Sequence, residues 1–124
     1  MNRDIKFRAW VKLENDKQSY AGLYEVEGLD FFNSLVKVER ASHFCHKIFR
    51  FEEVELMQHT GLKDKNGVEI YEGDIFIINE SKPEEVNSVE FDDGEYRLIP
   101  HGLSLPEWRL NGEVIGNIYE NPEL

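Results

Sequence analysis

The stretch that decides the fold is Thr60-Gly61-Leu62-Lys63-Asp64-Lys65-Asn66-Gly67-Val68-Glu69-Ile70-Tyr71-Glu72-Gly73-Asp74-Ile75. Short apolar runs lie on both sides of Asn66-Gly67, and Glu72-Gly73-Asp74 leads into the apolar run 75–78. An Asn-Gly pair between apolar runs predicts a β-hairpin, because both residues tolerate the positive φ of a type I′ turn. We therefore expect a tight hairpin followed by a buried strand.

The rest of the second half repeats this pattern. Asp93-Gly94 and Asn111-Gly112 predict two further two-residue turns. The strand-like runs between the turns are 68–71, 74–79, 87–91, 95–99 and 113–119. Several short strands joined by tight turns are typical of a small closed or nearly closed β-barrel.

Two glycines and one acid in these runs have expected structural roles. Gly73 predicts a backbone bend where the next strand begins, and Asp74 is placed to accept free N–H groups of that turn. Gly116 interrupts the last strand and predicts a bulge or a close backbone approach.

The first half predicts β structure as well. Apolar Ile5, Phe7, Ala9, Val11 and Leu13 alternate with Lys6, Arg8, Trp10 and Lys12, which predicts a half-buried strand over 5–13. A second strand is expected over 20–26, and runs around Phe49–Phe51 and Val54–Leu56 suggest others. The spacing of Leu29, Phe32, Leu35 and Val36 predicts a short helix, with a loop containing a 3₁₀ turn as the alternative. We expect one mainly β domain over 1–124, with an N-terminal β extension (1–58) and a barrel (59–124).

Composition restricts the class of protein. The chain has 124 residues and one cysteine, Cys45, which rules out an internal disulfide and suits a reducing compartment. No leader-like or membrane-spanning apolar run is present, so we expect a soluble cytoplasmic protein. The net charge is −11, of which 61–124 carries −10. Such a field repels nucleic acids and anionic membranes and favours basic partners or simple solubility.

No set of residues predicts a reaction. His43, Cys45 and His46 form the only metal-like cluster, but they do not supply four ligands, and His59 and His101 would complete a site only through an unseen contact. A Cys45–His46 nucleophile is disfavoured, because adjacent strand residues point to opposite faces. Phosphate-binding loops, dinucleotide fingerprints and zinc-protease motifs are absent. We therefore predict no catalytic, cofactor or metal residues and no enzyme.

Five aromatic residues allow two structural interpretations. They either fill a small core, which we favour, or line a groove for an extended peptide. The five residues are Trp10, Tyr71, Tyr96, Trp108 and Tyr119.

Four segments together resemble the YopX family of phage and prophage proteins from Gram-positive bacteria. They are Ile5-Lys6-Phe7-Arg8-Ala9-Trp10, Met57 to Gly67, Ile70-Tyr71-Glu72-Gly73-Asp74-Ile75 and Glu113 to Leu124. The resemblance implies an SH3-like barrel in the second half and a phage origin. It implies no established activity, cofactor or catalytic residue, and residues 14–56 match no motif.

These observations lead to a functional expectation. We expect a non-enzymatic phage accessory protein that binds a host or phage protein, with no membrane or small-molecule ligand. The alternatives are an acidic mimic of nucleic acid and, less favoured by the charge, a protein that binds nucleic acid through cations of the first half. Self-association through strand 5–13 or an aromatic patch is also open.

Overall fold

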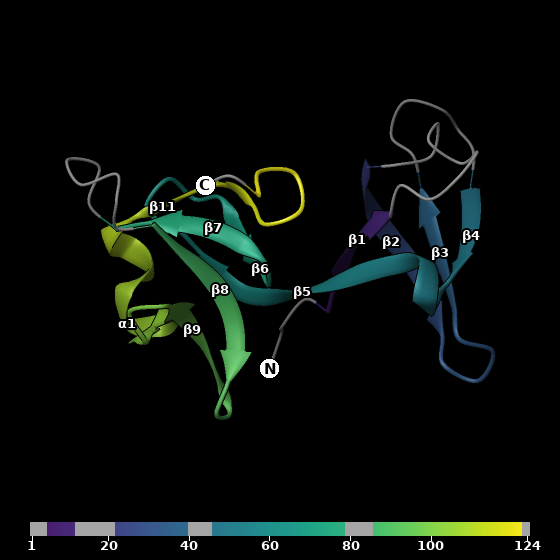
Figure 1. Cartoon of the computed structure of the whole chain (residues 1–124), viewed down its shortest axis with the longest axis horizontal. Coiled ribbons are helices and arrows are strands. Elements are labelled where there is room, and N and C mark those ends of the chain that lie inside the picture. The colour runs from purple at the N-terminus through teal and green to yellow at the C-terminus, as the bar shows by residue number, and fades with distance from the viewer. Residues whose placement is uncertain (1–4, 12–21, 40–45, 79–85, 123–124) are drawn as a thin grey trace. The chain divides into compact units, whose positions relative to one another are not determined.

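The computed structural model describes residues 5–11, 22–39, 46–78 and 86–122 (Figure 1). Over these residues the fold is mainly β, with antiparallel sheets and one short helix, α1 (Leu105–Trp108). The chain divides into two compact units. Lys6–Gln58 forms one, and most of the other is His59–Leu124.

The Lys6–Gln58 unit is an antiparallel sheet in the order β4-β3-β2-β1-β5. Its elements are β1 (Phe7–Val11), β2 (Gly22–Asp30), β3 (Leu35–Glu39), β4 (His46–Arg50), the 3₁₀ turn η2 (Phe51–Glu53) and the first half of β5 (Val54–Lys63). Its core is apolar and consists of Ala9, Val11, Tyr24, Val36, Val38, Phe49 and Val54.

The predicted first strand forms as β1, and its alternation holds only in part. Ala9 and Val11 are buried as expected, but Ile5 precedes the strand and is 83% exposed, so its predicted burial is wrong. Leu13 lies outside the described residues. Because β1 pairs with β2 on one side and β5 on the other, it has no free edge. Pairing between copies along a sheet edge would therefore need a strand other than β1, and self-association stays a prediction.

The predicted helix over 29–36 is also wrong. β2 continues to Asp30, a turn follows, and β3 begins at Leu35. Leu29 and Val36 are cross-strand partners, so a hairpin brings together the same apolar residues that helical spacing would. The β-branched Val36 and Val38 favour the strand.

The second unit contains a five-stranded antiparallel sheet in the order β10-β9-β8-β7-β11. Its elements are β7 (Asp74–Ile77), β8 (Val86–Asp92), β9 (Glu95–Ile99), β10 (Leu103–Ser104), α1, η3 (Arg109–Asn111) and β11 (Glu113–Asn117). The second half of β5 pairs with β6 (Glu69–Tyr71). A core of Ile70, Phe76, Val89, Leu98 and Leu105 lies in this unit. In the described part of the chain the sheet has two edges, so a closed SH3-like barrel stays a prediction.

The three predicted turns have three different outcomes. Asp93-Gly94 is the expected type I′ turn, with φ of 52° and 83°. At Asn66-Gly67 only Gly67 has positive φ, and Gly67 N–H donates to Asp64 O, so the loop has three residues and the two-residue prediction is wrong. Asn111-Gly112 is not a hairpin turn. Gly112 is extended and lies so close to Ile77 O that a Cβ would collide with it.

The buried carboxylate of Asp64 joins this loop to β11. Its Oδ1 accepts hydrogen bonds from the backbone N–H groups of Asn66 at 2.8 Å and Val68 at 3.0 Å, and its Oδ2 accepts from Val114 at 2.9 Å. Asp64 is 2% exposed. Charge-assisted bonds of this kind are stronger than neutral ones, so the side chain fixes the loop and the last strand together.

The other expected structural roles are confirmed. Gly73 has a φ of 83°, and Asp74 Oδ2 accepts from the Tyr71 N–H at 2.8 Å. The β7–β11 register shifts between Val114 and Gly116, and a Cβ on Gly116 would collide with the Asn121 side chain. Gly73, Asp74 and Gly116 therefore determine the course of the backbone in the second half.

Replacement of Asp64 by alanine should lower the free energy of unfolding by about 3 kcal/mol, because three backbone donors lose a charged acceptor. The measurement is urea unfolding followed by Trp108 fluorescence in a Trp10→Phe background, so that the signal reports this unit. Asp92→Ala, at an exposed position, is the matched control and should change stability by less than about 0.5 kcal/mol. Equal stabilities of the two variants would refute this role.

Candidate protein-binding surface

Among the described residues of the Lys6–Gln58 unit, the most exposed apolar side chains lie at the tip of the β2–β3 hairpin. Phe31 is 74% exposed and Phe32 is 95% exposed. Single exposed apolar residues are common on protein surfaces, but two adjacent phenylalanines present a contiguous apolar area. We call residues 30–34 the aromatic tip.

Local hydrogen bonds hold the backbone of the aromatic tip. The Asp30 carboxylate accepts from the Asn33 backbone N–H at 3.0 Å and from the Asn33 side-chain amide at 2.8 Å. Ser34 has a φ of 57°, which turns the chain into β3. A loop capped in this way loses little conformational entropy when a partner binds.

The two phenylalanines differ in their surroundings. The Phe31 ring meets Phe51 edge to face, with 5.9 Å between centroids, and the Phe51 N–H donates to Ser34 O at 2.9 Å. Phe51 in turn packs against the core of its unit. Phe31 is therefore anchored, and Phe32 has almost its whole side chain in solvent.

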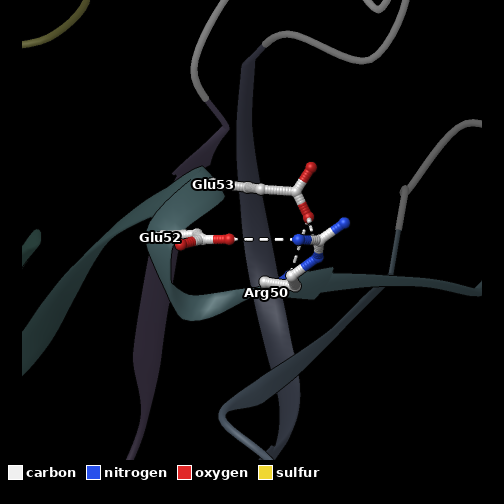
Figure 2. A network of polar contacts seen from close by, with 3 residues as sticks. All are labelled: Arg50, Glu52 and Glu53. Carbon is white, nitrogen blue, oxygen red and sulfur yellow. Dashed lines mark hydrogen bonds and ion pairs between the residues drawn. The ribbon is translucent and has the colours of Figure 1, made fainter.

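A charged network lies where β4 meets η2. Arg50 Nη1 lies 3.2 Å from Glu52 Oε1, and Arg50 Nε lies 4.0 Å from Glu53 Oε1. Figure 2 shows both carboxylates reaching the guanidinium. Glu53 also accepts the Arg50 backbone N–H at 2.9 Å. Because Asp30 adds a third carboxylate against the one arginine, this end of the sheet is locally anionic.

An apolar hollow of about 280 Å³ lies on the same sheet next to the aromatic tip. Gly28, Lys37 and Ile48 are cross-strand partners in one row of side chains, and Asp30, Leu35 and Arg50 form the next row of the same face. Gly28 contributes no side chain, and a Cβ there would meet no atom within 4 Å. Gly28, Leu29, Asp30, Leu35, Lys37 and Ile48 line the hollow.

Comparison with known proteins identifies the family. The profile of the family described as YopX protein matches residues 6–124. The chain belongs to the YopX family. A crystal structure of protein EF1440 from Enterococcus faecalis is similar, with a TM-score of 0.66 and 30% sequence identity over 98% of both chains. A search of curated proteins finds no match.

The metal-like cluster of this YopX-family chain falls largely outside the described residues. His43 and Cys45 lie there, and of His46 only its backbone place in β4 is described. Among the side chains that the structure does describe, no group of three or more His, Cys, Asp or Glu is arranged to hold a metal ion. No described helix is long and apolar enough to cross a membrane.

The remaining two histidines, His59 and His101, each contact neighbouring side chains of the fold. His59 is 6% exposed, packs against the Tyr71 ring with 5.0 Å between centroids, and has Glu69 Oε1 3.9 Å from Nε2. His101 is exposed, and its backbone N–H and Nδ1 both lie within hydrogen-bond distance of Asn87 Oδ1, at 3.2 and 2.8 Å. Neither arrangement presents a nucleophile with an orienting base.

The predicted aromatic set belongs mostly to the core. Tyr71 is 5% exposed, and Tyr96 and Trp108 pack against the core of the second unit. Trp10 and Tyr119 are half-buried. The core reading therefore fits these residues better than a common peptide groove.

Three described cations of the first half have local partners. Arg8 Nη2 lies 3.6 Å from Met57 Sδ, Lys37 pairs with Glu27 at 3.8 Å, and Arg50 pairs with Glu52. Over the described residues this is a mixed surface, which does not suit phosphate binding.

Sequence reasoning missed the aromatic tip because it read Phe32 as part of a helix face. A usable signal was present in Asp30-Phe31-Phe32-Asn33-Ser34. Asp, Asn and Ser are turn formers, and two large apolar residues between them at a turn cannot both be buried.

The cap of the tip should depend on pH. The hydrogen bond from the Asn33 side chain, followed by those from the Asn33 and Phe32 backbone N–H groups, lowers the pKa of Asp30 below its ordinary value of 3.8. A carboxyl with a depressed pKa stabilises the folded tip above its unfolded pKa and loses this effect as the pH falls through its folded pKa. The Asn33 amide resonance should therefore be constant above about pH 4 and shift below it.

The control for this titration is Asp30→Asn, which removes the ionisable group. In that variant the low-pH shift of Asn33 should disappear. A shift that persists unchanged would show that another group titrates at the tip.

Proposed function

We propose that this YopX-family protein is a non-enzymatic phage accessory protein that acts in the host cytoplasm by binding another protein through the aromatic tip. The observation that carries the proposal is Phe32, which is 95% exposed on a capped hairpin. Aromatic side chains contribute much of the binding energy at protein interfaces, and a preorganised loop lowers the entropic cost of association.

The local charge supports a protein partner. Asp30, Glu52 and Glu53 outnumber Arg50 beside the tip, and this repels phosphate groups of nucleic acids and anionic lipids. A protein surface with an apolar pocket satisfies both the phenylalanines and the charge.

Replacement of Phe32 by serine should weaken partner binding about thirtyfold, as expected for loss of an aromatic interface residue. A partner is first captured from host lysate, and its affinity for purified wild-type and variant protein is then measured by titration. Leu110→Ser, at a 60% exposed position in the other unit, is the control and should bind like the wild type. Equal affinity of wild type and Phe32→Ser would refute the proposal.

Acidic mimicry of nucleic acid is the second candidate, favoured by the β8–β9 hairpin. This hairpin carries four carboxylates and one cation, which are Glu90, Asp92, Asp93, Glu95 and Arg97. Mimicry predicts that a captured DNA-binding protein is released by duplex DNA. It also predicts that the variant Asp92→Asn/Asp93→Asn weakens capture while Phe32→Ser does not. The opposite pattern supports binding through the tip.

A further inference from the structure

The aromatic tip protrudes, and the apolar hollow beside it is recessed. Phe32 projects into solvent, and Gly28 leaves the floor of the hollow open beside Lys37, its cross-strand neighbour. Both features belong to the β2–β4 part of one sheet, so two copies of this face can each supply one protrusion and one recess. We propose that the partner seated on this surface is a second copy of the chain, with Phe32 of each copy in the Gly28 hollow of the other. This inference rests on the proposed role of the tip in binding.

A twofold axis relating the two copies gives a closed dimer, with no further copies added. In a two-fold interface the same patch serves both copies, so a contact from Phe32 to the hollow occurs twice. The twofold axis then passes between the tip and the hollow, near the cross-strand pair Asp30–Leu35.

The charge distribution favours this unit for self-association. Lys6–Gln58 carries 8 Lys or Arg and 9 Asp or Glu, a net charge of −1, whereas the whole chain carries −11. Two copies repel each other less through this unit than through the acidic one, although the carboxylates beside the tip, Asp30, Glu52 and Glu53 against Arg50, still oppose the contact. Lys37 and Asp30 both line the hollow, so the face presents both signs and can be complementary to itself.

The area is that of a weak dimer. A phenylalanine side chain buries about 150–250 Å². At the observed exposures, the two phenylalanines of both copies would remove roughly 500–850 Å² from water. Ile48, which is 63% exposed, and Leu35 bring the total to about 1,000 Å², the lower end for a specific interface. We expect a reversible dimer with a dissociation constant in the micromolar range.

Two variants remove the two sides of the contact separately. Phe32→Ser deletes the protruding ring. Gly28→Leu fills the recess, and the structure has room for it because a Cβ meets no atom within 4 Å and Gly28 does not require positive φ. Val68→Ser, at a 47% exposed position in the other unit, is the control.

Sedimentation equilibrium of the full chain tests the inference. The wild type and Val68→Ser should dimerise, and Phe32→Ser and Gly28→Leu should each be monomeric over the same concentrations. A mixture of the two variants keeps one of the two contacts, the ring of Gly28→Leu in the open hollow of Phe32→Ser, so it should form a heterodimer about thirtyfold weaker than the wild-type dimer but tighter than the dimer of either variant alone. A structural defect in either variant would not be rescued by mixing.

A wild type that stays monomeric overturns the inference, and so does a mixture that associates no more than the separate variants at concentrations about thirtyfold above the wild-type dissociation constant. Failure of the dimer does not by itself refute the proposed function, because binding to a foreign partner is measured separately. A foreign partner whose affinity still depends on Phe32 shows that the tip binds a different protein. A partner indifferent to Phe32 removes the proposed function as well.

Discussion

The second unit depends on one buried carboxylate. Asp64 accepts three backbone N–H groups, two from its own loop and one from Val114 in β11, and so joins segments that lie fifty residues apart in the chain. A buried charge is tolerable only when its hydrogen bonds are complete, so this site restricts both the loop and the last strand. Asn66 adds a bond to Glu113 at 2.6 Å, and Arg109 donates to the Lys63 carbonyl at 3.0 Å, which strengthens the same junction.

Several residues in the segments that resemble the YopX family likewise shape turns or accept backbone hydrogen bonds. Gly73 turns the chain before β7, and Asp74 accepts the Tyr71 N–H. Asn117 Oδ1 accepts from Tyr119 and Glu120 in the C-terminal turn. Because these polar groups are committed to backbone hydrogen bonds, these segments shape the scaffold of the second unit.

The two units also differ in net charge. Nearly all of the negative charge belongs to the second unit, while the first has balanced charges arranged in local pairs such as Lys37–Glu27 and Arg50–Glu52. Exposed pairs of this kind add little stability. Their consequence is that the first unit carries little net charge, apart from the anionic end of its sheet at Asp30, Glu52 and Glu53.

The sequence alone determined the β class, most strand positions in the second half, the Asp93-Gly94 turn and the bulge at Gly116, because alternation and turn residues act over a few neighbouring positions. Only the tertiary structure decided that 29–36 is a hairpin, since Leu29 and Val36 suit either a helix face or a cross-strand pair until a neighbouring strand supplies hydrogen bonds. It likewise decided that Asn66-Gly67 and Asn111-Gly112 do not form type I′ turns, because Asp64 is bonded to Val114, fifty residues away, and Gly112 lies against Ile77 O. The hollow at Gly28 depends on which strands pair, and no local pattern contains that information.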